Sequence, residues 1–422
     1  MITDLQETQF PETYTRFVDL LQSKPWLKAT EKHKLQIKAN PFSQDQIYRE
    51  NRVAYGLTFF EADGMALAGS DVWPTVQHAL SFAAQVCQLV DQAQDEAGKL
   101  GYLGRIRGAF SNPNEMRAIR FEHLTAMNMF RQGAQIEWPE TKAGTERFDI
   151  LATIPGDVSI ELECKSCSPD KGRPITERDA SQFFTHLVQR MVSATNPGEV
   201  LVMKVRIPKR LPTAESELMA LAEEVKKAFE AGATAAEKDV LLTHQRYSSP
   251  LLANPVHPDY ILFAVNELAT RLFGAAEGHR AIVFAEKKPA ALCIEICSGR
   301  AVEFFDAMWE TAKHAIQKQM TKLRPGCLVI RLEGLARDEL ELLGQEVPNP
   351  LGWFAEKVLT DSRHQHLACL AYISDEEMTS TSPGTESAQS CSYVFDRPTG
   401  QYANLGIGRY LLGSKPAGAE PR

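Results

Sequence analysis

Residues 148–168, FDILATIPGDVSIELECKSCS, decide the fold, because two apolar strands flank a Pro-Gly-Asp turn at 155–157. Successive side chains of a strand point to opposite faces of the sheet. The second strand therefore turns its apolar residues to one face, and Glu161, Glu163 and Lys165 to the other. Two carboxylates and an ammonium group are costly to bury unless that face opens onto a cleft or a metal ion.

The segments around this hairpin predict a helix, three strands, a second helix and a fourth strand. The first helix, at 112–133, starts with turn-forming residues and stops at Gly133. AQIEWPE at 134–140 is expected as the first strand, and TERDASQFFTHLVQRMVSAT at 176–195 as the second helix. GEVLVMKVRI at 198–207 is nearly all apolar, which is typical of a central strand covered on both faces.

A chain of 422 residues and 47.0 kDa exceeds one typical core, so two or three domains are expected. We expect a helical amino-terminal region at 1–105, an α/β core at 106–211 and an additional α/β region at 212–422. Within the last region, DEEMTSTSPGTESAQS at 375–390 is polar and almost free of large apolar side chains, which predicts a mobile loop.

A weak internal similarity links two parts of the chain. IELECKS at 160–166 and EVLVMKVRI at 199–207 flank one predicted helix, and LCIEICS at 292–298 and GCLVIRLEG at 326–334 flank another. The second copy has no lysine after Glu295. A degenerate repeat of the first segment and a chance similarity of two α/β segments are both compatible with this pattern.

Composition and charge restrict the class of protein. Hydrophobic residues make up 44% of the chain and charged residues 24%, as in an ordinary globular protein. No signal sequence and no membrane-spanning stretch is recognisable, so we expect a cytoplasmic protein that does not contact membranes. The eight cysteines are scattered, which predicts reduced thiols. With a net charge of −8, the chain needs a local basic surface to bind nucleic acid, and Arg117 and Arg120 are candidates for it.

Acidic residues from three segments are predicted to converge. Ile119, Glu122 and Ala126 are spaced by three and four residues, so Glu122 lies on the apolar stripe of its helix and points to the sheet. Asp149 begins the first hairpin strand, and pairing across the turn brings its carboxylate toward that of Glu163. Carboxylates beside a lysine suit Mg²⁺ or Mn²⁺, which prefer oxygen ligands, and a phosphodiester substrate.

Asp149 followed by Glu163-Cys164-Lys165 resembles the Asp…(Asp/Glu)-x-Lys signature of the PD-(D/E)xK nuclease superfamily, which has a restriction-endonuclease-like fold. The core of that family has the same order of helix, three strands, helix and strand, and a glutamate often lies in its first helix. The resemblance covers about 115–208. It implies that Asp149 and Glu163 bind a metal ion, that the Cys164 carbonyl adds a ligand, that Lys165 is the catalytic lysine and that Glu122 is the helix acid.

Two further positions compare less closely with the family. Gln182 and His186 are similar to the Gln-x-x-x-Tyr element of some members, with histidine in place of tyrosine, and are candidate substrate contacts. A solvated helix face explains this pair about as well. Phe148 stands where the proline of the family name would be.

The sequence therefore predicts a Mg²⁺-dependent DNA endonuclease of restriction, repair or defence type, with double-stranded DNA as its substrate. The carboxy-terminal region is expected to bind a partner protein or a second copy of the chain. The alternative is a catalytically inactive nucleic-acid-binding or assembly protein that kept the fold. A zinc site from Cys164, Cys167, Cys293 and Cys297 is a weaker possibility, because Cys164 falls on the apolar side of its strand.

Overall fold

The computed structural model describes residues 4–92, 96–138, 147–235, 239–249, 252, 258–285, 289–375, 377–382, 385–403 and 405–412. Two compact units make up the chain. The main unit consists of Met1–His33, Tyr48–Lys171 and Phe305–Arg422. The inserted unit consists of Lys34–Ile47 and Gly172–Phe304. No helix in the described part of the chain combines the length and the apolar composition needed to cross a bilayer.

A six-stranded mixed sheet organises the main unit, in the order β13-β10-β9-β4-β3-β2. β2, β3 and β4 form an antiparallel meander, β9 and β10 continue it in parallel with β4, and β13 is antiparallel to β10. The β3–β4 turn has positive φ at Gly156 (98°) and Asp157 (60°), backbone conformations that glycine and aspartate tolerate. The strands are β2 (Gln135–Glu137), β3 (Ile150–Ile154), β4 (Val158–Cys167), β9 (Gly326–Leu332), β10 (Leu367–Ile373) and β13 (Ser392–Asp396).

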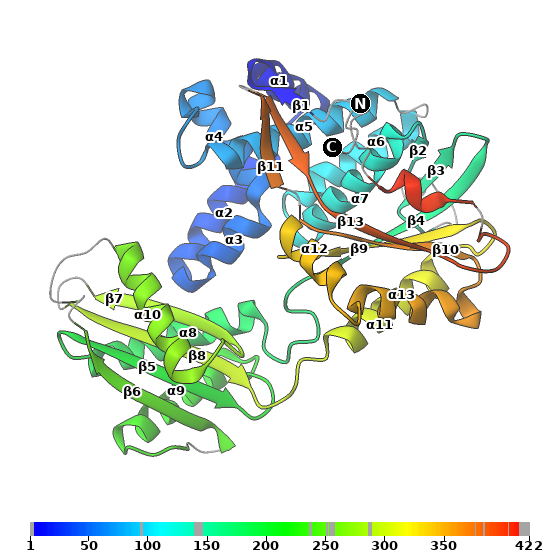
Figure 1. Cartoon of the computed structure of the whole chain (residues 1–422). Helices are drawn as coiled ribbons and strands as arrows, with labels where there is room; N and C mark the ends of the chain where they lie inside the picture. Colours follow the sequence, from blue (N-terminus) through cyan, green and yellow to red (C-terminus); the bar gives the residue numbers. More distant parts are fainter. Residues whose placement is uncertain are drawn as a thin grey trace. The chain divides into compact units, whose positions relative to one another are not determined.

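Helices cover both faces of this sheet, and Figure 1 shows α7 on one face and α11 and α13 on the other. α7 begins at Pro113, where the Asn112 side chain accepts a hydrogen bond from the Asn114 N–H, and it ends before Gly133. The expected helical region precedes it in the chain. The helices are α1 (Phe10–Leu21), α2 (Pro25–Ala39), α3 (Gln44–Glu50), α4 (Arg52–Asp63), α5 (Trp73–Gln92), α6 (Glu96–Ala109), α7 (Pro113–Arg131), α11 (Phe304–His314), α12 (Arg337–Gln345) and α13 (Pro350–Thr360).

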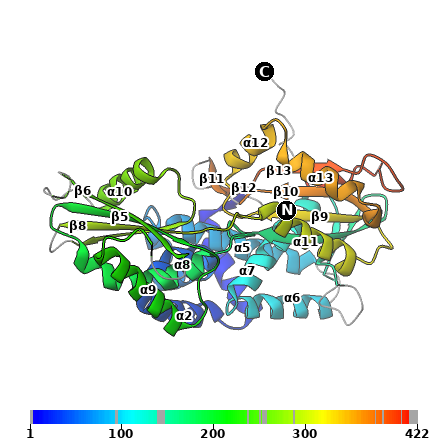
Figure 2. The ribbon, with the colours of Figure 1, turned by 90° about the horizontal axis from the view of Figure 1, so that it is seen from below.

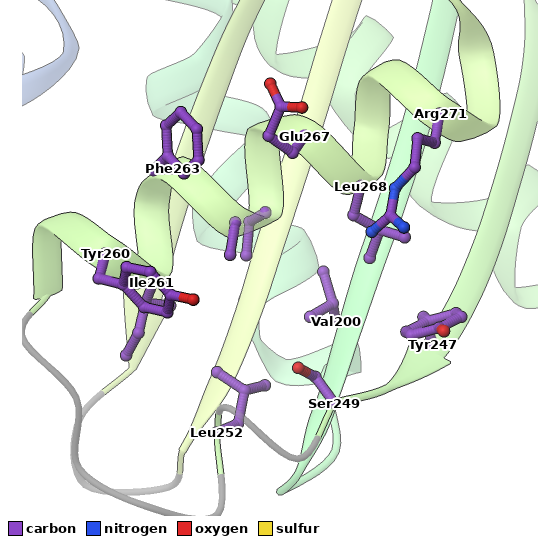
Figure 3. A pocket seen from close by; sticks show the side chains of 12 residues that line it. Val200, Tyr247, Ser249, Leu252, Tyr260, Ile261, Phe263, Glu267, Leu268 and Arg271 are labelled. Atoms are coloured by element: carbon purple, nitrogen blue, oxygen red, sulfur yellow. The ribbon is translucent and has the colours of Figure 1, made fainter.

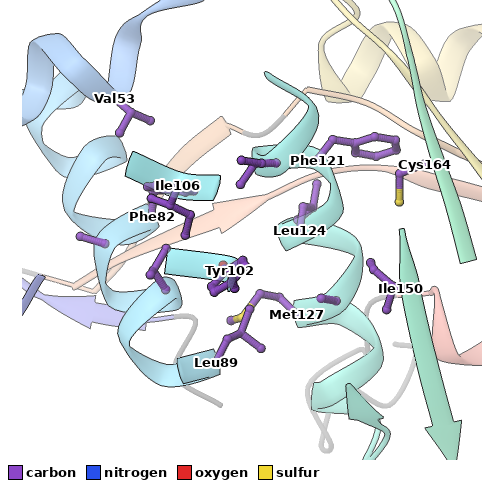
Figure 4. Close-up of a cluster of buried hydrophobic side chains, with 14 of the residues drawn as sticks. Val53, Phe82, Leu89, Tyr102, Ile106, Phe121, Leu124, Met127, Ile150 and Cys164 are labelled. Carbon is purple, nitrogen blue, oxygen red and sulfur yellow. The ribbon is translucent and has the colours of Figure 1, made fainter. Parts of the chain in front are cut away.

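The largest hydrophobic core of the main unit joins the amino-terminal helices to the sheet (Figure 4). Phe82 from α5 and Tyr102 from α6 meet Leu124 of α7, and α7 in turn packs on Ile150 and Cys164 of the hairpin strands. All of these residues are buried. Except for Lys34–Ile47, the helical region expected at 1–105 is therefore part of the same unit as the hairpin, and α7 is held from both sides.

The inserted unit has its own four-stranded sheet, in the order β6-β5-β8-β7. β5 and β8 are parallel, and β6 and β7 are antiparallel edge strands (Figure 2). Separate clusters of buried side chains hold α8 and α9, and α10, against it. The elements are α8 (Glu177–Met191), β5 (Glu199–Ile207), α9 (Glu215–Glu230), β6 (Leu241–Ser248), α10 (Pro258–Phe273), β7 (His279–Ala285) and β8 (Ala290–Ser298).

These findings confirm the mixed α/β class and correct the expected core at 106–211. The strand at 199–207 does not join the sheet of the hairpin, because β5 pairs with β6 and β8 in the other unit. β9 takes the place beside β4 instead, with Glu163 opposite Leu328. Both β5 and β9 are apolar enough to be central strands, so composition alone does not identify the partner of β4.

The boundary predicted near 212 is also wrong, because residues 212–422 contribute to both units. The two similar segments do not form one unit each. The first strand of each segment pairs with the second strand of the other, β4 with β9 and β5 with β8.

The segment 375–390 is not a loop in the structure. It contains β11 (Glu377–Ser382) and β12 (Thr385–Gln389), which pair with each other and with β1 (Asp4–Gln6), while residues 376, 383 and 384 lie outside the described residues. Backbone hydrogen bonds between strands do not require apolar side chains, and threonine favours strands. The polar composition therefore misled the prediction.

Candidate active site

The site begins where β4 extends beyond its neighbour β3. The last paired residues of the two strands are Ile150 and Leu162, so the backbone of Cys164 faces the position at which β3 has ended. The Cys164 N–H donates to Oδ2 of Asp149 at 2.7 Å. A side-chain carboxylate thus replaces the missing strand, and this hydrogen bond fixes Asp149 beside the strand that carries Glu163 and Lys165.

Lys165 follows Cys164 on β4, in the part of the strand that extends beyond β3. Its ammonium group donates to Glu163 Oε1 and, at 3.2 Å, to the Cys164 carbonyl oxygen. Glu163 is fully buried, whereas the Lys165 side chain keeps 23% of its exposure. Lys165 therefore links a buried carboxylate to the surface, as a group that meets a substrate must.

Glu122 reaches the site from α7, on the buried stripe predicted for it. Arg105 of α6 binds both of its carboxylate oxygens, at 2.5 and 2.7 Å, and also donates to Glu115 at 2.7 Å. Glu122 is 4% exposed, so this ion pair is shielded from water. The structure places Glu122 in a two-pronged ion pair, which the sequence did not indicate.

Burial and charge shift the pKa values in this cluster. Burial raises the pKa of Asp149 above its ordinary value, although Lys165, the Cys164 N–H and Arg105 act in the opposite direction. Burial tends to lower the pKa of Lys165, but Glu163 and Asp149 outweigh it and raise that pKa. Burial also raises the pKa of the Cys164 thiol, so the sulfur stays protonated. The lysine is therefore a cation at neutral pH.

The oxygen atoms here have the chemistry that a hard divalent cation prefers. They are the carboxylates of Asp149 and Glu163 and the carbonyl of Cys164, and Mg²⁺ in proteins is commonly bound by one or two carboxylates with water and substrate oxygens. In the described residues, no group of three or more His, Cys, Asp or Glu side chains is arranged to hold a metal ion. The two carboxylates alone are too few ligands for Mg²⁺, so the site fits this ion only if the Cys164 carbonyl, water and substrate oxygens complete its coordination.

All eight cysteines are free, and in the described residues no group of three or more His, Cys, Asp or Glu side chains includes Cys164, Cys167, Cys293 or Cys297 as a metal site.

Gln182 and His186 both lie on α8, which packs on the sheet of the inserted unit, whereas Lys165 belongs to the main unit. His186 Nε2 lies 2.8 Å from Glu215 of α9. The helix that follows β4 within the main unit is α11, which begins after the inserted residues.

Arg117 and Arg120 lie on α7 in the main unit and are engaged with protein groups. Arg117 contacts Glu333 at 3.2 Å, and Arg120 lies 2.6 Å from the Nε2 atom of His78 on α5. Both arginines project from the first half of the helix that carries Glu122.

Glu161, which the sequence left without a role, is fully buried. The Thr321 N–H donates to it at 2.8 Å, the Thr321 hydroxyl donates to its other oxygen, and Arg324 donates to it at 3.1 Å. The Arg324 guanidinium also lies 5.4 Å from the centre of the Phe148 ring. Glu161 thus anchors the segment before β9 to the hairpin. The only signal of this role in the sequence was the presence of a charged residue, Glu161, in an otherwise apolar strand.

A separate hollow of about 340 Å³ lies in the inserted unit between α10 and the ends of β5 and β6 (Figure 3). Tyr247, Tyr260 and Phe263 line it and are each about half exposed or more, at 48%, 52% and 64%. Among the described residues, Glu267 and Arg271 supply the charge of its lining. The described lining thus holds one carboxylate and no lysine, unlike the end of β4.

Comparisons with protein-family models, with curated proteins and with solved structures found no match for this chain. The cluster formed by Asp149, Glu163, Cys164 and Lys165 is therefore the basis for the function proposed below.

Proposed function

We propose that the protein is a Mg²⁺-dependent nuclease that hydrolyses phosphodiester bonds, and specifically a DNA endonuclease of restriction, repair or defence type. One observation carries the proposal. Where β3 ends, Asp149 binds the amide of Cys164 while Lys165 binds both its carbonyl and Glu163. Three hydrogen bonds thereby join two carboxylates, a backbone carbonyl and a lysine at one strand end.

The order of elements in the main unit supports the same proposal. α7, β2, β3 and β4 are followed, after the inserted residues, by α11 and β9, with β9 parallel to β4. This is the order of helix, three strands, helix and strand that the PD-(D/E)xK nucleases share. In this arrangement α11 and β9 take the places that the sequence assigned to α8 and β5, which belong to the inserted unit.

Each residue would then have a defined role. Asp149, Glu163 and the Cys164 carbonyl would hold the metal ion, which supplies an acidified water and stabilises negative charge on the phosphate. Lys165, a cation held against Glu163, would orient the attacking water and neutralise charge that develops on the phosphate. Glu122, held by Arg105, would shape the negative potential behind Asp149.

A non-catalytic nucleic-acid-binding or assembly protein is the second candidate. Glu163 already pairs with Lys165, and Glu122 already pairs with Arg105, so both carboxylates are neutralised by protein cations. Such pairing is what a structural ion-pair network would also produce. The two functions differ in whether the pair at Lys165 opens to admit a metal ion and a phosphate.

The test is Mg²⁺- or Mn²⁺-dependent cleavage of supercoiled plasmid by the wild type and by Glu163→Gln and Lys165→Met. We expect each substitution to lower cleavage by at least about 100-fold, the loss typical of removing one group that stabilises transition-state charge. Glu310→Gln and Lys313→Met are matched controls, because these residues form an exposed pair on α11 in the same unit.

Equal cleavage by the wild type, the site variants and the controls would remove the proposed site. Binding of Mn²⁺ can be followed by calorimetry in parallel. A nuclease site should lose the metal in Asp149→Asn, whereas a scaffold should bind none that depends on Asp149.

A further inference from the structure

We propose that the hollow between α10 and the ends of β5 and β6 in the inserted unit binds one nucleobase, and that Arg271 holds a phosphate of the same nucleotide (Figure 3). Bases stacked inside a duplex cannot enter a hollow, so the ligand is a free nucleotide, a single strand or a base extruded from a double helix. That this base belongs to a strand that the protein cleaves rests on the proposed nuclease function. The binding of a base to the hollow does not.

The hollow exists because α10 covers one part of its sheet and leaves the edge open. α10 contacts β7, β8 and β5, and it contacts the edge strand β6 less. Tyr247 on β6 lies directly opposite Val200 on β5, so both side chains stand on the same face of the sheet. Val200 packs with Ile261 and Leu268 of α10, which identifies this face as the one that α10 covers. Tyr247 therefore stands beside the helix, about half exposed.

The floor of the hollow is apolar and fixed in position. Val200, Leu252, Ile261 and Leu268 line it, and all four are buried because they belong to the hydrophobic cluster beneath α10. A volume of about 340 Å³ lies at the lower end of the range for small-molecule sites, roughly 300–1,000 Å³. The size of the hollow therefore suits one planar ring system rather than a larger ligand.

Three aromatic side chains border this floor and remain open to solvent. Tyr247, Tyr260 and Phe263 line the hollow with about half or more of their surface exposed. In the described part of the chain, none of the three rings packs on another aromatic ring. Exposed rings of this kind are stacking surfaces for nucleobases, because every base has a π-face, and one stacked base changes affinity about fivefold or more. These rings favour a planar ligand over an aliphatic chain.

The charge at the hollow suits an anionic group on that ligand. Arg271 and Glu267 lie one turn apart on α10, yet no ion pair joins them, and Arg271 has no carboxylate partner among the described residues. In Figure 3 the Arg271 side chain extends from the helix toward Tyr247, whereas Glu267 projects away from Val200. The guanidinium of Arg271 is therefore available to a phosphate, which it can bind through two parallel hydrogen bonds.

Hydroxyl groups at the hollow match the polar edge of a base. Ser249, Tyr247 and Tyr260 each contribute one, and none of these hydroxyls has a hydrogen-bond partner among the described residues. A hydroxyl both donates and accepts, so these groups can serve the edges of different bases. An apolar peptide or a lipid chain would remove water from the hydroxyls and from Arg271 without replacing its hydrogen bonds, which is unfavourable.

The test measures binding of a fluorescein-labelled single-stranded oligodeoxynucleotide by the full-length protein in EDTA, so that no metal-dependent step contributes. Tyr247→Ala should weaken binding about fivefold or more. Arg271→Gln should also weaken it and should reduce the slope of log K against log salt by about 0.7. Both side chains are exposed, so the melting temperatures should match that of the wild type. Met219→Ala and Arg210→Gln remove exposed side chains elsewhere in the inserted unit and, as controls, should change little.

A strand of the same length without bases separates the two parts of the ligand. Tyr247→Ala should leave the binding of this abasic strand unchanged, whereas Arg271→Gln should still weaken it. Calorimetry with a free deoxynucleoside monophosphate distinguishes the sources of the base. If Tyr247→Ala impairs binding of the monophosphate and not of the strand, the hollow takes free nucleotides.

The inference is wrong if Tyr247→Ala and Arg271→Gln, both folded, bind the strand and the monophosphate as the wild type does. An equal loss for the strands with and without bases in Tyr247→Ala would also overturn it. So would a dimer that binds no nucleotide and that Tyr247→Ala dissociates, because a second copy would then cover the hollow. Base-dependent binding by a protein that cleaves no DNA would retain the hollow as a nucleotide site and reject the nuclease. Mg²⁺-dependent cleavage together with binding that does not respond to Tyr247→Ala would do the reverse.

Discussion

The ion pair between Arg105 and Glu122 gives the sharpest quantitative prediction. Arg105 binds both oxygens of Glu122, at 2.5 and 2.7 Å, and the two side chains are only 19% and 5% exposed. Removal of either partner leaves the other charge buried, and broken buried pairs cost about 3–5 kcal/mol. Arg105→Met and Glu122→Gln should each lower the free energy of unfolding by roughly that amount.

A double-mutant cycle isolates the pair. In Arg105→Met/Glu122→Gln neither side chain carries an uncompensated charge, so the double substitution should cost about 3 kcal/mol less than the sum of the single ones. Urea titration of the four proteins measures this coupling. Glu310→Gln/Lys313→Met, built on an exposed pair, should show a coupling below about 1 kcal/mol. A coupling that small for Arg105 and Glu122 would refute the view that α6 holds Glu122 in place.

Three other features of the main unit lead to measurable expectations. Glu161→Gln should lower the free energy of unfolding by about 2–4 kcal/mol in urea titration, because the buried carboxylate accepts from Thr321 and Arg324; an effect below about 0.5 kcal/mol would contradict the anchoring role. Burial lowers the pKa of His123 to about 3, so as the pH falls the unfolded chain binds a proton at this residue before the folded protein does. The contribution of neutral His123 to the free energy of unfolding is therefore complete above the ordinary pKa of 6.5 and is lost as the pH falls below it. At pH 5 the loss due to this residue is up to about 2 kcal/mol, and thermal melts of His123→Phe should depend less on pH than those of the wild type. Seven cysteines are buried and Cys391 is half-buried, so Ellman's reagent should modify Cys391 alone in the native protein and eight thiols in urea.

Local sequence patterns predicted the hairpin and the groups that gather on it. Asp149 directly precedes β3, and the turn at 155–157 brings it beside the carboxyl-terminal half of β4. The alternation along β4 separates Cys164 from Glu163 and Lys165. These relationships depend on residues close in the chain, so periodicity and turn chemistry were sufficient to predict them.

Contacts between distant segments were not predictable in the same way. Composition does not determine which apolar strand lies beside β4, and β5 is the candidate that comes first along the chain. The roles of Arg105 and Glu161 depend on partners from α6 and from the segment before β9. A charged residue in an apolar strand indicates a need for a partner, but it does not say which partner is available.

About 130 residues separate β4 from α11, yet the two elements belong to the same unit. The entropic cost of closing a loop rises only slowly with its length, so an insertion of this size does not prevent the sheet of the main unit from forming. The Glu303 N–H donates to the Gly172 carbonyl at 3.1 Å, so the two ends of the inserted segment meet. Gly172 has φ of +74°, and a Cβ there would lie 2.5 Å from the backbone of Glu303, so only glycine permits this approach. With its ends joined, the inserted unit behaves toward β4 and β9 as a short loop would. The register of these strands, and with it the pairing of Ser166 with Arg331, therefore does not depend on the length of the insertion.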